Sequence, residues 1–139
     1  MTDNEALAYC AGLIDGEGCI KIQRTMNKDR KSPKYETSIT VRMTAKQPVE
    51  FLTKTFNGNL TSNILYTGKI YWSWTVLSTK AKAVAERLLP FLVFKKNQAE
   101  LLIEFQNRLT ANWGSGCSLS QAEIALRDEL WLRLKALHA

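Results

Sequence analysis

The sequence predicts an α+β fold in which helices cover one face of an antiparallel sheet. Two pairs of segments alternate between apolar and polar residues, a pattern typical of antiparallel strands that have one wet face. Helical segments precede, separate and follow these pairs, with signals that mark where they start and stop. The resulting order is α-ββ-α-ββ-α-α-α, which suits a layer of helices packed on one side of a sheet.

The first helix is expected to begin at Thr2 and Glu5, which have the spacing of a capping box. The apolar stretch 6–14 forms its body, and Gly16 and Gly18 mark its end. This helix leads directly into the first strand.

The first hairpin is predicted between strands at 19–24 and 36–44, joined by the polar and basic loop 25–35. The alternation assigns each strand residue to one of two faces. The inward positions are Ile20, Ile22, Ile39, Val41 and Met43, and the outward positions are Lys21, Gln23, Ser38, Thr40, Arg42 and Thr44.

A short helix at 48–56 is expected to start with Pro48 and to stop at Asn57-Gly58. The second hairpin then has strands near 59–66 and 70–77 around a Thr67-Gly68 turn. Its second strand places Trp72, Trp74 and Val76 on the core face, whereas the register of the strand near 59–66 stays open.

The remainder is helical. One helix spans 79–89, limited by Pro90, and a second spans 97–109. A capping box of Ser120 with Glu123 opens the last helix. Its apolar stripe is expected to be Leu126, Leu130, Leu134 and Leu137.

Length and charge bound the function. The 139 residues suffice for one domain (1–139), with a core at about 5–109 and a C-terminal helix at 118–138. No apolar run approaches the roughly 18 residues of a membrane span.

Residues 18–96 hold fifteen of the nineteen Lys and Arg but only four of the thirteen acids, so this segment carries +11 and the rest −5. Such polarity favours a basic surface that faces a polyanion. A well-solvated basic protein without such a partner is the alternative.

Cysteine and histidine chemistry is not expected to dominate. Cys10, Cys19 and Cys117 lack C-x-x-C spacing, so neither a disulfide framework nor a zinc site is predicted, and a reducing compartment fits best. The single histidine, His138, is expected to lie on a frayed end, which argues against a histidine base.

The segment most suggestive of chemistry is CAGLIDGEG, residues 10–18. Small residues at Ala8, Ala11 and Gly12 would let two helix backbones approach closely. The acids that follow stand at the negative end of the helix dipole, an unfavourable position that suggests a nearby cation such as Mg²⁺. An ordinary core helix that ends in solvated acids is the competing interpretation.

This nonapeptide closely resembles the LAGLIDADG motif of homing endonucleases, in its sequence and in its place between a first helix and a hairpin. The segment Pro90-Phe91-Leu92 followed by Lys95 also resembles that family, and the similarity covers about residues 5–109. The resemblance implies an αββαββα core with further C-terminal helices, whose antiparallel sheet forms a DNA-binding saddle.

Site residues follow from the resemblance position by position. It makes Glu17 the metal-binding acid, Gly16 the donor of a backbone carbonyl to the metal, and Asp15 a support for the paired helix ends, together with Ala8 and Gly12. It makes Lys95 a catalytic lysine near the cleaved bond. Ala45 departs from the family, which often has Gln there to hold water, so Gln47 or Lys46 is expected to take over.

One motif per chain implies a homodimer that cuts double-stranded, pseudo-palindromic DNA, because each strand needs its own site. The resemblance implies Mg²⁺ as cofactor, with Mn²⁺ able to substitute and Ca²⁺ bound without cleavage. It also implies cleavage across the minor groove that leaves 3′ extensions. We expect an intracellular protein without membrane contact, encoded within an intron of an organelle (chloroplast or mitochondrion), bacterium or phage.

The wet sheet face is the predicted reading surface, because a β-ribbon fits the major groove. The loop cations are expected to touch phosphates and the strand residues to touch bases. The DNA-binding candidates are Lys21, Gln23, Thr25, Lys28, Arg30, Lys31, Lys34, Ser38, Thr40, Arg42, Thr44, Tyr71, Ser73 and Thr75. Two alternatives are a non-cleaving intron maturase or DNA-binding regulator of the same fold, and a helix-paired structural dimer without nucleic acid. The target sequence is not predicted.

Overall fold

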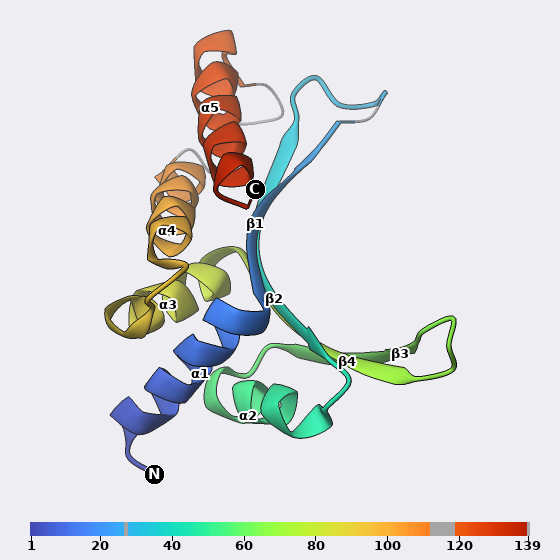
Figure 1. Ribbon diagram of the computed structural model, residues 1–139. Coiled ribbons are helices and arrows are strands. Elements are labelled where there is room, and N and C mark those ends of the chain that lie inside the picture. The colour runs from blue at the N-terminus through green and yellow to red at the C-terminus, as the bar shows by residue number, and fades with distance from the viewer. Residues whose placement is uncertain (27, 112–118, 139) are drawn as a thin grey trace.

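A computed structural model describes residues 1–26, 28–111 and 119–138. Its centre is a curved, four-stranded antiparallel sheet in the order β1-β2-β4-β3 (Figure 1). All helices lie on the convex side, and the concave side is open (Figure 1). The strands are β1 (Gly18–Thr25), β2 (Lys34–Met43), β3 (Asn59–Ile64) and β4 (Ile70–Leu77).

The predicted element order is confirmed, with one short 3-10 turn added. The helices are α1 (Asp3–Glu17), α2 (Lys46–Phe56), α3 (Ser78–Leu88), η1 (Leu89–Phe91), α4 (Lys96–Ala111) and α5 (Gln121–Leu137). No helix within the described ranges is both long and apolar enough to cross a bilayer.

Helix α1 begins at the predicted capping box. The Thr2 hydroxyl accepts the backbone N–H of Glu5 at 3.2 Å, and the Glu5 carboxylate accepts that of Thr2 at 2.8 Å. Of the two glycines expected to mark the end of this helix, Gly18 closes it, but Gly16 lies inside it. Gly18 has an extended backbone, but a Cβ there would lie 2.8 Å from the Ile14 Cα. Close approach is therefore what demands glycine.

The first hairpin has the predicted faces. Ile20 lies opposite Ile39, and both are buried under the helices, whereas Lys21 lies opposite Ser38 on the open face. Strand β2 begins at Lys34, two residues earlier than expected, because Tyr35 is buried and continues the strand.

Helix α2 starts at Lys46, two residues before the predicted Pro48. Proline is tolerated there because N–H groups of the first turn have no partner within a helix. The predicted stop is confirmed: Asn57 and Gly58 both have positive φ, at 62° and 98°. A side chain at Gly58 would also strike the Trp74 indole at 2.7 Å.

The pairing of β3 with β4 answers the open question of register. Leu60 lies opposite Trp74 and Ile64 opposite Ile70, so these residues lie on the convex side of the sheet, where Ile64 and Ile70 remain exposed. The other side of β3, which faces the open concave surface, therefore carries Asn59, Thr61 and Asn63.

Two buried clusters hold the layers together. The larger one packs α1, α2 and α3 on the sheet around Trp74, Leu52 and Ile14. The smaller one lies under α5 and includes Phe105 and Leu134.

The predicted leucine stripe of α5 is only half right. Leu130 and Leu134 are buried, but Leu126 and Leu137 are 44% and 39% exposed. Helix α5 packs on α4, on β1 and on Tyr35 of β2, and the face it presents to them holds Arg127 in place of Leu126. Arg127 tolerates burial because its guanidinium pairs with Glu123 at 3.0 Å.

The C-terminal end of α5 is anchored, so the expectation of a frayed His138 was wrong. Its Nε2 lies 2.6 Å from the Ile20 carbonyl oxygen, and the Gln98 amide donates to the Leu137 carbonyl at 3.1 Å. Cys10 is buried and Cys19 is exposed, both as free thiols, whereas Cys117 lies outside the described residues. Burial raises the pKa of the Cys10 thiol.

Candidate functional site

The centre of the candidate site is the C-terminal end of α1. Glu17 is the last residue of the helix, and both it and Gly16 are exposed. Carbonyl groups in a last helical turn lack partners within the helix, which leaves the Gly16 oxygen available as a ligand. One chain thus presents one carboxylate and neighbouring carbonyl oxygens, the hard donors that Mg²⁺ prefers.

Lys95 lies beside this helix end although 77 residues separate it from Gly18. The Lys95 ammonium donates a hydrogen bond to the carbonyl oxygen of Gly18, the residue that follows Glu17. The fold thus brings together the acid and the lysine that the sequence singled out.

Asp15 fixes the position of that lysine. Its two carboxylate oxygens accept the backbone N–H groups of Val93 at 2.8 Å and of Lys95 at 2.9 Å. The carboxylate therefore clips the segment that enters α4 onto the end of α1. Within one chain, this is a supporting role that the sequence did not reveal.

The departure at Ala45 is visible in the structure. Ala45 is exposed directly before α2 and offers no side-chain cap. Of its two expected substitutes, Lys46 lies over the Trp72 ring, 4.5 Å from its centroid, whereas Gln47 is exposed in the first turn of α2. In the described part of the chain, no hydrogen bond joins Gln47 to the motif.

The end of α1 offers few side-chain ligands for a metal ion. The described residues contain no group of three or more His, Cys, Asp or Glu side chains that could hold an ion. Glu17 and Gly16 fit a hard cation chemically, but they are too few to surround one.

The concave face of the sheet collects most of the predicted DNA contacts. Lys21, Gln23 and Thr25 project from β1, and residues of β2 and β4 continue the surface. Two pairs are preorganised: the Arg42 guanidinium lies 5.7 Å from the Tyr71 ring centroid, and the Thr40 and Thr75 hydroxyls are 3.3 Å apart.

Not every predicted contact is equally accessible. Ser38 and Ser73 belong to the concave face but are only 4% and 9% exposed. They lie in the two central strands, where neighbouring side chains cover them. The exposed candidates include Lys21, Gln23 and Thr25 of edge strand β1, Lys34 at the start of β2, Thr44 after it, and Lys28, Arg30 and Lys31 in the hairpin loop.

The sequence missed one row of this surface. Asn59, Thr61 and Asn63 of β3 lie on the concave face, opposite Thr75, Ser73 and Tyr71. The apolar residues of segment 59–66 do not alternate regularly with polar ones, so the sequence does not reveal the register. The pairing of β3 with β4 is what assigns these three side chains to the concave face.

The sequence profile of LAGLIDADG endonucleases matches residues 10–105, from the motif to α4. The chain belongs to the LAGLIDADG endonuclease family. No curated protein matches its sequence significantly.

Solved homing endonucleases share the fold of this family member. The archaeal intron-encoded I-Vdi141I, complexed with DNA, matches with a TM-score of 0.81 at 15% identity, over 98% of this chain and 86% of that one. I-CvuI, complexed with the I-CreI target in the presence of Mg, matches with a TM-score of 0.79 at 22% identity, over 97% and 83%. I-TnaI matches with a TM-score of 0.67 at 14% identity, over 99% and 96%.

Proposed function

We propose that this LAGLIDADG protein is a homing endonuclease that cuts both strands of a long pseudo-palindromic DNA site as a homodimer, using divalent metal ions. The observation that carries the proposal is the Asp15 clip, which brings Lys95 to the helix end that presents Gly16 and Glu17.

An unpartnered face of α1 supports the homodimer. Ala8 and Gly12 are exposed, and a Cβ added to Gly12 would meet nothing within 4 Å. Large apolar side chains, Val93 at 88% and Phe94 at 76% exposure, lie in the segment clipped to the same helix. Ala11, in contrast, is fully buried in the chain's own core and has no part in this face.

In the proposed dimer, the two α1 helices pack side by side and bring two Glu17 carboxylates to the twofold axis. In each copy, the Glu17 carboxylate and the Gly16 carbonyl would hold a Mg²⁺ ion. The bound ion would supply an activated water and neutralise charge on the leaving oxygen. Lys95 stabilises negative charge that develops on the phosphate. Gln47 holds water in place of the residue missing at Ala45.

The concave face supports DNA as the partner. The row of Lys21, Gln23 and Thr25 continues across the sheet to the Arg42–Tyr71 pair and to Asn59, so hydrogen-bonding side chains span all four strands. The relatives I-CvuI and I-Vdi141I are known in complexes with DNA, and I-CvuI also in the presence of Ca. We propose that Mn²⁺ replaces Mg²⁺ and that Ca²⁺ supports binding alone.

The deciding experiment selects cleaved sites from a partly randomised DNA library in the presence of Mg²⁺. Wild type is compared with Glu17→Gln and with Glu50→Gln, a matched loss of one exposed carboxylate on α2. We expect Glu17→Gln to bind the selected site and to lose cleavage, and Glu50→Gln to behave as wild type. Cleavage that survives Glu17→Gln would refute the site assignment.

A non-cleaving role, as an intron maturase or DNA-binding regulator, is the second candidate. The observation that favours it is Ala45, which supplies no polar side chain where the family often has one. Tight binding of a selected site without cleavage in either Mg²⁺ or Mn²⁺ would identify this role.

A further inference from the structure

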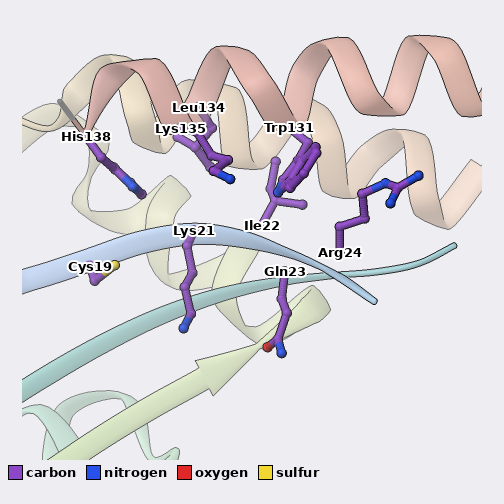
Figure 2. A pocket seen from close by; sticks show the side chains of 9 residues that line it. All are labelled: Cys19, Lys21, Ile22, Gln23, Arg24, Trp131, Leu134, Lys135 and His138. Carbon is purple, nitrogen blue, oxygen red and sulfur yellow. The ribbon is translucent and has the colours of Figure 1, made fainter. Parts of the chain in front are cut away.

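A pocket of about 350 Å³ lies at the free edge of β1, beneath the last turns of α5 (Figure 2). Strand β1 is an edge strand, so one of its sides has no neighbouring strand. Figure 2 shows Lys21 and Gln23 pointing away from α5, whereas Trp131, Lys135 and His138 come from the helix on the other side. The pocket is therefore where α5 approaches the border of the concave face.

The pocket is basic around an aromatic wall. The Trp131 ring lies between two cations, the Arg24 guanidinium at 5.5 Å and the Lys135 ammonium at 4.6 Å from its centroid. Asp128 balances Arg24 at 2.8 Å, but Lys135 has no carboxylate partner among the described residues. None of the nine residues that line the pocket is acidic.

The fold holds this wall in place. The His138 imidazole contacts the Ile20 carbonyl at 2.6 Å, and Leu134 is buried against the sheet. Lys135 is thus presented at the strand edge by a helix fixed at that edge, and Trp131 limits the directions in which its ammonium can point.

Sheet geometry indicates what this edge would meet. Four strands about 4.8 Å apart span about 14 Å, and the major groove is about 12 Å wide. A sheet of this width that faces the groove brings its edge strands close to the phosphates that border the groove. At the β1 edge of the sheet, the side chains that lie beyond the strand come from α5.

We propose that this pocket binds a phosphate group of the DNA backbone, with Lys135 as its main contact, so that α5 enlarges the DNA-binding surface beyond the sheet. The inference rests on the proposed DNA binding and adds a site outside the motif and outside the concave face. Such a contact is independent of base sequence and depends strongly on salt.

The test measures binding of a short labelled duplex of mixed sequence at salt concentrations from about 0.05 to 0.2 M, without divalent ions. The variants are Lys135→Gln, the charge-retaining Lys135→Arg, and Lys54→Gln. Lys54 is a matched control because it is also an exposed lysine in a last helical turn, but it lies in α2 behind the sheet. Thermal unfolding of each variant verifies that the fold is intact.

We expect Lys135→Gln to lower the slope of log affinity against log salt by about 0.9 per bound copy, and to weaken binding about tenfold at low salt. Lys135→Arg should retain the slope, and Lys54→Gln should match wild type. An unchanged slope in Lys135→Gln, or an equal loss in Lys54→Gln, would overturn the phosphate site alone. Wild-type protein that binds no duplex would overturn the proposed function as well.

Discussion

At the scale of single residues, Gly12 and Gly18 belong to the same motif but have different surroundings. A side chain at Gly18 would overlap Ile14, whose Cα and carbonyl oxygen both lie 2.8 Å from the added Cβ. A side chain at Gly12 would enter open space. The chain's own packing therefore explains Gly18, and Gly12 is left for an interaction with something else.

We expect Gly18→Ala to lower the free energy of unfolding by about 1–3 kcal/mol, because backbone atoms of Ile14 must shift. Gly12→Ala should not destabilise the monomer, because alanine favours a helix by up to about 1 kcal/mol. Urea unfolding at concentrations where both variants are monomeric measures the difference. Equal stability of the two variants would contradict this account.

A second residue-scale prediction concerns high pH. Burial of Tyr35, followed by the hydrogen bond that its hydroxyl donates to Asp128 at 2.6 Å, raises the pKa of Tyr35 to about 12. In the unfolded chain a tyrosine loses its proton near pH 10. The folded state keeps a proton that the unfolded state releases, so this contribution to stability is complete below about pH 10 and lost as the pH rises toward 12.

Stability measured from pH 9 to 12 should therefore decline less steeply in Tyr35→Phe than in wild type. In a titration followed by tyrosinate absorbance, the same variant should lack the ionisation step that occurs at the highest pH. An identical absorbance titration in both proteins would rule out the shift.

At the scale of elements, periodicity predicted what local patterns can encode. The capping box of α1, the two hairpins and the faces of β1 and β2 are as the sequence indicated. The register of β3 was not predictable because Thr61 and Asn63 alternate with another polar residue, Ser62. The face of α5 was misjudged because a buried ion pair involving Arg127 replaces one position of the expected leucine stripe.

The clip between α1 and the entry to α4 gives a prediction at this scale. Asp15→Asn keeps one carbonyl oxygen as acceptor, so the N–H of Val93 or Lys95 loses its partner. We expect a loss of about 1–3 kcal/mol in unfolding free energy. Asp3→Asn, an exposed acid in the first turn of α1, is the control and should cost less than Asp15→Asn.

Cleavage assays on the selected DNA site separate positioning from stability. If Asp15 places Lys95, Asp15→Asn should slow cleavage at temperatures where it is fully folded, with little change in DNA affinity. A variant that is destabilised yet cleaves at the wild-type rate would limit Asp15 to a structural role.

At the scale of the whole molecule, the sequence identified the ingredients of the candidate site but not their contacts. Glu17, Lys95 and Asp15 were each singled out, yet the hydrogen bonds of Asp15 and Lys95 join segments 77–80 residues apart. Local sequence patterns do not encode contacts between segments that lie so far apart in the chain. The basic pocket under α5 escaped prediction for the same reason, since Trp131 and Arg24 meet only in the folded chain.

The proposed homodimer gives the molecular-scale prediction. Gly12→Leu should yield a folded monomer, because a Cβ at this position meets none of the described residues within 4 Å, whereas a leucine there would separate the paired helices. Sedimentation velocity with and without DNA measures the mass. A dimer that persists in Gly12→Leu, or a monomeric wild type on DNA, would exclude pairing through this face.

The Asp15 clip also constrains how the chain folds. It closes a loop of about eighty residues that contains all four strands, and closing such a loop costs roughly 4 kcal/mol of chain entropy. Two hydrogen bonds to a carboxylate contribute about 3–6 kcal/mol, which is comparable to that cost, so the clip is most favourable once the strands have brought its ends together. A partly folded chain thus exposes Glu17 without Lys95 beside it. Under the proposed function, such a chain would lack the lysine that stabilises negative charge on the phosphate.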